Sequence, residues 1–364
     1  MRVLVADLER VWRGGQEQAL LLMTGLERRG HEAELVAVRN SAVASRAQAA
    51  GIRTHTVSDT ARRLGAAMRL RQLLRQQRFD IAYANEPHAL TAAWLARAHR
   101  HVPLASARRV AFPLSRGGIS LARYRAAARI LAISEAVRRE LLAAGLHNEY
   151  IELVPDGVEI PEPVTRETRE AARGRWGFRA DEPVLACVGA LTAEKGHALL
   201  IEAFAKLRRE MKSCRLLIAG EGRLRAELEQ RAQESGLGAA IIFAGFVPDV
   251  ESVYAAGDLF VFPSLQEGAG SSLLRAMAYG LPVLALARGG VAEIVEDGRN
   301  GILVQEASAE VLAWAAWGIL GDRELRERLS QAARETVASR YSADRMIEGT
   351  ERIFEQLISR NRDV

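Results

Sequence analysis

The sequence predicts an α/β protein built from two doubly wound, parallel-sheet domains. Three observations lead to this prediction. Short apolar runs alternate with segments of helical periodicity along the whole chain. The loops between them are short, as in parallel sheets whose two faces are covered by helices. A chain of 364 residues is too long for one ordinary core and has the length of two domains of usual size.

The first half of the chain accounts for one domain. Strands are predicted at residues 2–8, 32–38, 52–57, 81–86, 103–109, 128–134 and 151–158, and helices at 16–29, 60–77, 88–100 and 135–144. The proline-containing stretch VEIPEPVTRET then interrupts the alternation, because proline neither continues a helix nor donates to a β-ladder. We therefore expect an N-terminal domain over residues 1–158.

The second half restarts the alternation after a helical stretch at 166–177. Strands are predicted at 183–190, 214–221, 240–246, 259–264, 282–287 and 301–304, with helices from 195 and at 224–233 and long helical runs to the C-terminus. This predicts a C-terminal domain over 159–342 and a last helix at about 343–364 that packs back on the N-terminal domain. Two such domains leave a cleft into which the carboxyl ends of both sheets point, and a ligand is expected there.

Charge is distributed unevenly between the two halves. Residues 1–158 contain 24 arginines, no lysine and 14 acidic residues, whereas residues 159–364 contain 26 basic and 31 acidic residues. The basic half predicts an anionic partner, which could be a membrane surface, a phosphorylated acceptor or a nucleic acid. Alternatively, the arginines of the first half lie on solvent-exposed helix faces and have no particular partner, which would give the same counts of charged residues. No nucleic-acid-binding motif is recognised, so nucleic acid is not expected as a partner.

The compartment follows from what the chain lacks. No run of about 18 apolar residues could span a membrane, and MRVLVADLERVW resembles a first buried strand more than a signal peptide. We expect a cytoplasmic protein with Cys187 and Cys214 as buried, unreactive residues. The helix at 62–78 combines leucines and a methionine with six arginines, a pattern typical of peripheral contact with the inner face of the cytoplasmic membrane and also of amphipathic core helices.

Four glycine-marked loops, each between a predicted strand and a helix, carry the chemistry. In EGAGSSLLRAMAYGLP, Gly268 and Gly270 let a ligand approach backbone amides at a helix start, an arrangement that suits phosphate. Glu267 is a hydrogen-bond acceptor beside it, and Ser271 or Ser272 is expected to cap the helix. In VGALTAEKGH, Lys195 could neutralise a diphosphate.

The other two loops are WRGGQEQ, with Gly14 and Gly15, and LARGGVAEIVEDGRNG, with Gly289 and Gly290. The chain contains no G-x-x-x-x-G-K-[ST], no Cys/His cluster with zinc spacing and no D-x-D pair. A P-loop NTPase is therefore excluded, and the charge of a diphosphate must be met by lysine, arginine and helix ends. This predicts that a diphosphate is bound without a metal.

PSLQEGAGSSLLRAMAYGLPVLA followed by RGGVAEIVEDGRNGILV resembles the donor-site signature of glycosyltransferase family 4, the retaining nucleotide-sugar enzymes of GT-B fold. The segments RGGQEQALLLMTGLERRGHE, VGALTAEKG and AGFVPDVESVYAAGDLFVFPS also resemble that family, so the likeness covers nearly the whole chain. It implies a GT-B architecture in which the two domains face each other across a cleft.

The resemblance also implies roles for single residues. Glu267 matches an acid that contacts the hydroxyls of the donor sugar, Lys195 matches the diphosphate lysine, and Val247 matches the residue whose backbone contacts the base. The implied donor-binding residues are Gly15, Lys195, Val247, Glu267, Gly268, Ala269, Gly270, Ser271 and Arg275. Arg275 stands where the family usually has a second glutamate for the ribose, and arginine cannot accept hydrogen bonds, so that anchor is lost.

The acceptor side departs further from the family pattern. Arg109 stands where many members have a histidine near the donor sugar, and Tyr83 and Asn85 replace frequent histidines. The expected acceptor-side residues are Gly14, Glu86, His88, Arg108 and Arg109, and the expected catalytic residues are Glu267, Lys195 and Arg109. A surface ion pair is an alternative role for each of the two arginines.

The resemblance implies a metal-independent, retaining transfer of a sugar to a hydroxyl of a glycan or glycolipid, in bacterial envelope polysaccharide or lipopolysaccharide biosynthesis. It also implies that a nucleotide-diphosphate sugar is the co-substrate and that no cofactor is needed. Two alternatives exist. Loss of the ribose anchor would also fit a degenerate, non-catalytic GT-B protein that binds nucleotide weakly or serves as an assembly partner. A GT-B epimerase or phosphorylase is disfavoured, because it would not explain the glutamate-bearing donor loop.

Overall fold

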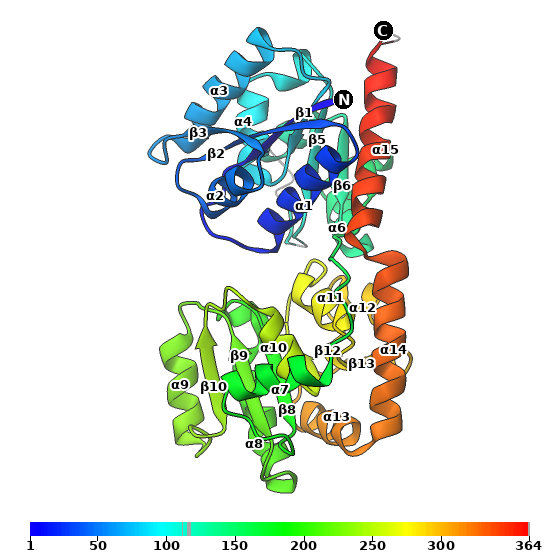
Figure 1. Cartoon of the computed structure of the whole chain (residues 1–364). Coiled ribbons are helices and arrows are strands. Elements are labelled where there is room, and N and C mark those ends of the chain that lie inside the picture. The colour runs from blue at the N-terminus through cyan, green and yellow to red at the C-terminus, as the bar shows by residue number, and fades with distance from the viewer. Residues whose placement is uncertain (111, 115–117, 363–364) are drawn as a thin grey trace. The chain divides into compact units, whose positions relative to one another are not determined.

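The structure is a computed structural model that describes residues 1–110, 112–114 and 118–362. It contains two compact units, unit 1 with Met1–Gly157 and Ala343–Val364, and unit 2 with Val158–Ser342. Residues 363–364 of the predicted last helix lie outside the described residues. Each unit is a parallel β-sheet packed with helices (Figure 1).

Unit 1 has a seven-stranded sheet in the order β3-β2-β1-β4-β5-β6-β7. The strands are β1 (Arg2–Asp7), β2 (Glu32–Val38), β3 (Arg53–Val57), β4 (Ile81–Ala84), β5 (Leu104–Arg108), β6 (Arg129–Ala132) and β7 (Ile151–Leu153). The helices are α1 (Gly14–Arg28), α2 (Ala42–Ala49), α3 (Arg62–Gln76), α4 (Pro87–Leu95), α5 (Gly118–Arg125), α6 (Glu135–Ala143) and α15 (Ala343–Arg362), with single 3-10 turns at Ala98–Arg100 and Asn148–Tyr150. The order reverses between β1 and β4, where the loops diverge and side chains can gather.

Helix α15 packs on unit 1, although it follows unit 2 in the sequence. Gly25 of α1 lies so close to it that an added Cβ would be 2.3 Å from Ile347 Cδ1. The Phe354 ring lies 5.5 Å from the Tyr83 ring, between centroids. These contacts make the last helix part of the hydrophobic core of unit 1.

Unit 2 has a six-stranded sheet in the order β10-β9-β8-β11-β12-β13. The strands are β8 (Val184–Val188), β9 (Arg215–Ala219), β10 (Ile241–Gly245), β11 (Leu259–Phe262), β12 (Val283–Leu286) and β13 (Ile302–Val304). The helices are α7 (Arg166–Arg175), α8 (His197–Glu210), α9 (Arg225–Glu234), α10 (Glu251–Ala256), α11 (Ser271–Ala278), α12 (Val291–Ile294), α13 (Ala309–Gly321) and α14 (Arg323–Arg340), with a 3-10 turn at Ala193–Lys195. Here the order reverses between β8 and β11.

The predicted fold class of two doubly wound parallel-sheet domains is confirmed. The strands were recognisable because both faces of each sheet are buried, which makes the strands continuous apolar runs. Helices α2, α5 and α10 were not predicted, because each is short and α2, with the sequence AVASRAQA, has a weak apolar stripe. Helix α1 begins at Gly14, two residues before its predicted start.

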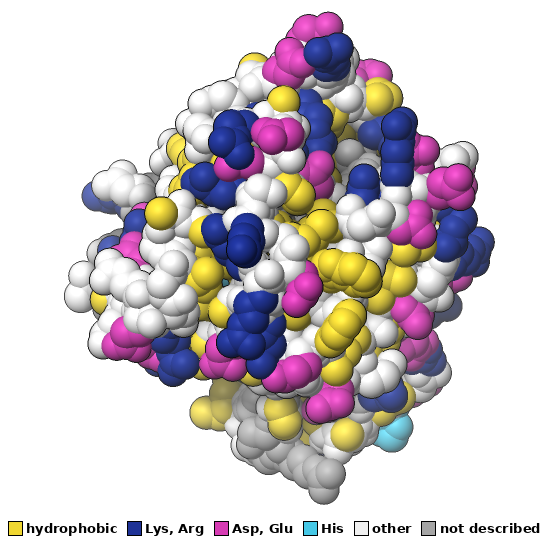
Figure 2. All heavy atoms as spheres, turned by 90° about the horizontal axis from the view of Figure 1, so that it is seen from below, with side chains coloured by type: hydrophobic (Ala, Val, Ile, Leu, Met, Phe, Trp, Pro, Cys, Tyr) yellow, Lys and Arg dark blue, Asp and Glu magenta, His cyan; other side chains and the backbone are white. Residues whose placement is uncertain are grey.

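The surface is of mixed character. On the face in Figure 2, hydrophobic side chains lie among lysines, arginines and acidic residues, so charges of both signs are interspersed there. None of the helices within the described residues combines the length and the apolar composition that a membrane crossing requires.

Candidate functional site

The loops at the carboxyl edge of the unit 2 sheet are joined to one another by backbone hydrogen bonds. The amide of Gly220, after β9, donates to the carbonyl of Gly245, at the end of β10, at 2.8 Å. The amide of Leu265, after β11, donates to the carbonyl of Glu194, after β8, also at 2.8 Å. The loops after β8 and β11 carry Lys195 and Glu267, so the sheet brings these two predicted residues together.

Two glycines allow these loops to pack closely. Gly196 has φ +69°, and a Cβ there would lie 2.0 Å from the carbonyl oxygen of Pro263. Gly289 has φ +57°, and a Cβ there would lie 1.9 Å from the carbonyl oxygen of Glu267. Only glycine fits both the backbone conformation and the space. The loops that bear the lysine and the glutamate are therefore held against their neighbours by backbone contact.

Lys195 and Glu267 form an ion pair between the lysine Nζ and the carboxylate Oε2. Their side chains are 25% and 14% exposed, so the pair is shielded yet reachable from solvent. The lysine Nζ also lies 5.9 Å from the centroid of the Phe262 ring. The two groups that the sequence assigned to diphosphate and sugar hydroxyls are in direct contact.

The loop after Glu267 leads into helix α11 through Gly270, which is the N-cap residue with φ +100°. The prediction that Ser271 or Ser272 caps this helix is wrong, because Gly270 turns the chain into the helix and Ser271 is already its first residue. Within the described part of the chain, no side chain caps α11. Its first-turn amides are thus directed to the loop side, where they can bind an anion.

Val247 and Arg275, which were predicted to contact the base and the ribose, lie after β10 and in α11. Val247 is 9% exposed and follows Phe246, which is 54% exposed, two residues after the end of β10. Arg275 lies in the second turn of α11, where burial lowers the pKa of its guanidinium while Tyr279, near the C-terminal end of the helix, raises it. Their contacts with base and ribose stay predictions.

His197 belongs to this site, and sequence reasoning missed it. Its Nε2 lies 3.1 Å from the Ala190 carbonyl oxygen, and burial lowers the pKa of the imidazole to about 4. The ring is therefore neutral, and its Nε2–H donates to that carbonyl. The Cys187 Sγ, 3.7 Å from Nδ1, has its pKa raised to about 12 by burial. The hydrogen bond from this histidine fixes the start of the loop that bears Lys195. In the sequence, the position of His197 two residues after Lys195 was the feature that could have identified it as part of the site.

In unit 1, Arg109 is held by three residues at the carboxyl ends of the strands. Its Nε donates to Asp156 Oδ1 at 3.0 Å, and its Nη1 donates to Asn85 at both Oδ1, 2.7 Å, and the backbone oxygen, 3.0 Å. Its Nη2 lies 3.4 Å from the Tyr83 hydroxyl. The side chains of Arg109 and Asp156 are only 14% and 9% exposed. Arg109 is thus a rigidly oriented, shielded cation.

Asn85 connects this arginine to the first loop. Its Nδ2 donates to Asp7 Oδ2 at 2.6 Å and to the Gly15 carbonyl oxygen at 2.9 Å. Asp7 is fully buried, which raises the pKa of its carboxyl, and it also accepts from Gln16 Nε2 at 3.0 Å. A Cβ on Gly15 would lie 3.6 Å from Arg109 Cδ. Asp7, Gln16 and Asp156 were not predicted, and they hold predicted Gly15 and Arg109 together.

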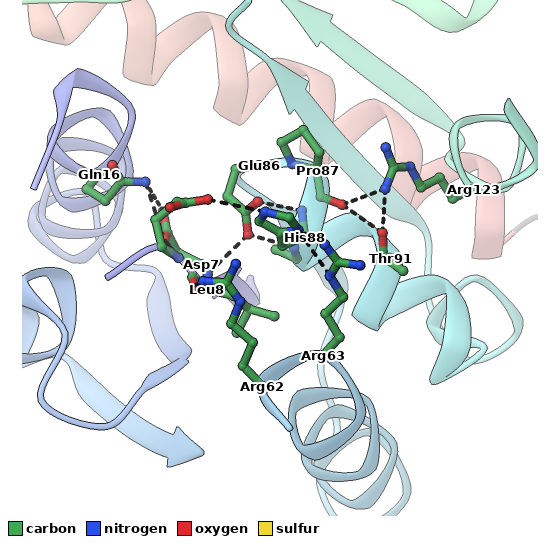
Figure 3. A network of polar contacts seen from close by, with 12 residues as sticks. Asp7, Leu8, Gln16, Arg62, Arg63, Glu86, Pro87, His88, Thr91 and Arg123 are labelled. Carbon is green, nitrogen blue, oxygen red and sulfur yellow. Dashed lines mark hydrogen bonds and ion pairs between the residues drawn. The ribbon is translucent and has the colours of Figure 1, made fainter. Parts of the chain in front are cut away.

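Glu86 is the N-cap of α4. Figure 3 shows it close to Asp7 and His88, with Arg62 and Arg63 reaching in from α3. Its Oε1 accepts from the amides of Leu8, 3.1 Å, and Ala89, 2.6 Å, and its Oε2 accepts from the amide of His88. Burial, and secondarily the charge of Asp7, raise the pKa of Glu86 to about 7.

His88 is oriented by Arg63, whose Nη2 and Nε donate to its Nδ1 at 2.6 and 3.1 Å. The proton therefore sits on Nε2, which faces Glu9 Oε1 at 3.6 Å. Burial lowers the pKa of His88, as do the charges of Arg63 and Arg62. Ligand atoms of Glu9, Glu86 and His88 lie within 4.8 Å of one another, but N–H donors already occupy both Glu86 oxygens and His88 Nδ1. This makes the cluster a poor cation site, and metal independence stays a prediction.

The side chains of the neighbouring residues Arg108 and Arg109 have different surroundings. Arg108 is 5% exposed, and its guanidinium donates to the Tyr124 hydroxyl at 3.1 Å and to the Phe112 carbonyl oxygen at 2.6 Å. The surface-ion-pair alternative is wrong for Arg108, because the side chain packs inside unit 1 against α5. Its acceptor-side role stays a prediction.

Two family models match consecutive parts of the chain. The model of glycosyl transferases group 1 matches residues 168–336, and the model of Glycosyltransferase Family 4 matches residues 12–161. The first match contains Lys195, Val247 and the loop of Glu267, and the second contains Gly15, Glu86 and Arg109. The two models thus cover both groups of predicted residues.

Curated relatives and solved structures agree with these matches. The chain is 36% identical to the alpha-D-kanosaminyltransferase of Streptomyces kanamyceticus over 49% of this chain and 46% of that protein. It is 33% identical to the lipopolysaccharide core biosynthesis glycosyltransferase LpsE of Rhizobium meliloti over 47% and 49%. The chain thus spans about half the length of these curated relatives.

Among solved structures, HepE of Anabaena in complex with UDP and glucose superimposes with a TM-score of 0.85 at 22% identity, over 98% of this chain and 100% of that one. An identity this low shows the fold alone. The likeness to HepE and the two parallel sheets show the two-domain GT-B fold. The two family models, which together cover both units, show that the chain belongs to glycosyltransferase family 4, the group 1 glycosyl transferases.

Proposed function

We propose that the protein transfers a sugar from a nucleoside diphosphate sugar to a hydroxyl of a glycan or glycolipid, with retention at the anomeric carbon and without a metal. The observation that carries this proposal is the contact of Lys195 with Glu267 beside the start of α11. An ammonium group and helix amides suit a diphosphate, and a carboxylate suits sugar hydroxyls. The Lys195 ammonium, the Glu267 carboxylate and the first amides of α11 all lie at the carboxyl edge of the unit 2 sheet.

In this mechanism the donor diphosphate leaves from the face that the acceptor hydroxyl attacks, and it helps to accept the proton of that hydroxyl. Lys195 and the amides of Gly268 to Ser271 stabilise the charge that develops on the diphosphate. Glu267 orients the sugar by accepting hydrogen bonds from its hydroxyls. No protein base is required. In unit 1, Arg109 supplies a fixed cation for the acceptor side.

The names of similar proteins support the choice of substrates. HepE binds UDP and glucose in its crystals, which supports a UDP-sugar donor. LpsE acts in lipopolysaccharide core biosynthesis, which supports an acceptor of the bacterial envelope. The kanosaminyltransferase is 36% identical to the chain and LpsE is 33% identical. Only the name of LpsE, of these two, gives an envelope role, so the proposal of envelope glycan synthesis rests on LpsE.

The test is a panel of UDP-, GDP- and ADP-sugars, with transfer and slow hydrolysis measured in the presence and absence of EDTA. Proton NMR of the first-formed sugar reports its anomeric configuration. Turnover with retained configuration and no EDTA effect is expected. If a nucleoside diphosphate raises the melting temperature of the protein but no donor is turned over, the non-catalytic alternative is correct.

We also propose that α3 contacts anionic membrane. Its predicted apolar residues divide into two sets, because Leu70, Leu73 and Leu74 are buried in unit 1 whereas Leu64 and Met68 are 61% and 70% exposed. Leu64 and Met68 follow the helical spacing i, i+4, and the arginines of α3 at 63, 71 and 75 lie in the same helix.

Vesicle sedimentation tests this contact. Binding to vesicles with phosphatidylglycerol, and not to pure phosphatidylcholine vesicles, is expected because the arginines need anionic headgroups. Leu64→Ser with Met68→Ser should abolish that binding. Leu142→Ser, at an exposed leucine of α6, is the matched control. Equal sedimentation of the wild type and the double variant would rule the contact out.

A further inference from the structure

Unit 2 contains a cavity of about 790 Å³ at the amino ends of its strands, opposite the edge that bears Lys195 and Glu267. Asp258 precedes β11 and Tyr279 precedes β12, and both line it. Helix α14 supplies most of the other side chains, and α7 contributes Arg169. The cavity has the size of a small-molecule site and is separate from the donor loops.

Arginines dominate the lining, with four of them against two carboxylates: Arg169, Arg323, Arg326 and Arg334 against Asp258 and Glu327. The carboxylates are already engaged. Asp258 pairs with Arg169 and also with Arg173. Glu327 accepts from Arg323 Nε at 2.7 Å. Among the described lining residues no third carboxylate is present to balance the charges of the other two guanidinium groups, those of Arg326 and Arg334.

Those two arginines are held in place by backbone carbonyls. Arg334 donates to the oxygens of Ala278, 2.9 Å, and Pro161, 2.5 Å. Arg326 donates to the oxygens of Ile319, 3.1 Å, and Leu320. Carbonyl oxygens orient a guanidinium group without neutralising its charge. The arrangement therefore fixes two positive charges at the cavity before any ligand binds.

The neighbouring positive charges affect the pKa of Arg169. Burial lowers the pKa of its guanidinium, and the charges of Arg173 and Arg326 lower it further, while Asp258 opposes them. An anion in the cavity would relieve this repulsion. Guanidinium forks match the geometry of phosphate oxygens, and Ser330 in the lining offers a hydroxyl donor.

We propose that this cavity binds a small phosphate ester, with the phosphate at Arg326 and Arg334 and the organic part against Tyr279 and Leu281. The cavity is larger than a phosphate ion, and its apolar lining from Tyr279, Leu281 and Pro282 would stay uncovered by phosphate alone. The site is independent of the proposed transfer reaction, because it lies at the opposite edge of the sheet.

Isothermal titration with glucose 6-phosphate, carried out in excess UDP, tests the proposal. UDP occupies the donor loops, so heat of binding that persists reports a second site. Glucose 6-phosphate should bind more tightly than inorganic phosphate, and glucose should not bind. Loss of binding in the presence of UDP, or equal binding of glucose, would overturn the proposal.

Variants locate the site. Ser330→Glu adds a carboxylate to the lining, and Arg323→Gln releases Glu327; each should weaken binding about tenfold or more. Arg328→Gln removes an equal charge from the same helix, but Arg328 donates to the Gly298 carbonyl oxygen and does not line the cavity. It should bind like the wild type. Unchanged melting temperatures show that the variants are folded, and unaltered affinity in Ser330→Glu would place the ligand elsewhere.

Discussion

Lys195 and Glu267 lie 72 positions apart in the chain, and their side chains are joined as an ion pair at the carboxyl edge of the unit 2 sheet. The relationship has a direct consequence for nucleotide binding. A lysine that already neutralises a carboxylate is less available to a diphosphate, and the two anions compete for it. Removing one partner should therefore not have the same effect as removing the other.

Glu267→Ala should lower the transfer rate by about 100-fold or more, since sugar orientation is lost, while leaving UDP affinity unchanged or tighter because Lys195 is released. Lys195→Ala should weaken UDP binding about tenfold. Calorimetry with UDP and initial rates measure the two effects. Lys206→Ala is the matched control, since Lys206 of α8 pairs with Glu310 of α13, away from the donor loops. If both site variants weakened UDP equally, the competition would be disproved.

The sequence predicts the two sheets well, because buried parallel strands are continuous apolar runs that stand out from amphipathic helices. It also points to Lys195 and Glu267, since each lies in a glycine-marked loop before a helix. Their direct pairing could not be predicted, because it depends on how the backbones of two distant loops pack at Gly196 and Gly289. Side-chain partners set by packing have no local signal in the chain.

On the acceptor side, too, the sequence identifies a residue but not the partners that hold it. Arg109 was singled out because it stands where many family members have a histidine, yet its partners Asp156 and Asn85 come from two other loops. Arg108, its neighbour, was given a surface ion pair as an alternative role, and its side chain instead packs inside unit 1 against Tyr124. Consecutive residues at a strand end point in opposite directions, and only the surrounding packing determines which of them reaches the loop cluster.

Gly289→Ala should impair the donor site more than it impairs folding. A Cβ there would lie 1.9 Å from the Glu267 carbonyl oxygen, so the loop that bears the glutamate must move. Gly298→Ala is a matched control, because Gly298 has a similar φ of +72° with open space around its position. Each alanine should cost about 1–2 kcal/mol of unfolding free energy from backbone strain. Only Gly289→Ala should also reduce turnover, and equal turnover in both variants would show that the close contact is not needed.

Asp156→Ala should destabilise unit 1 by about 3 kcal/mol, because it leaves the shielded guanidinium of Arg109 without its carboxylate partner. Glu152→Ala is the control. Glu152 is 43% exposed and pairs loosely with Arg129, at 3.6 Å, so its loss should cost under about 1 kcal/mol. Urea denaturation measures both. Similar losses of unfolding free energy for the two variants would mean that the Arg109–Asp156 pair contributes no more than a surface pair.

Glu86 should make unit 1 less stable as the pH rises from about 4.5 to about 7. Its pKa in the folded protein is raised from 4.5 to about 7, chiefly by burial, so in this range the folded chain keeps a proton that the unfolded chain has released. At 1.36 kcal/mol per pKa unit, the effect amounts to up to about 3 kcal/mol, and it is constant above pH 7. Glu86→Gln removes the titration, so the unfolding free energy of this variant, measured in urea at several pH values, should fall less than that of the wild type over this range. Glu135→Gln, at a glutamate of α6 whose side chain is 48% exposed, should retain the wild-type slope. Parallel curves for Glu86→Gln and wild type would show that Glu86 is ionised in the folded protein throughout.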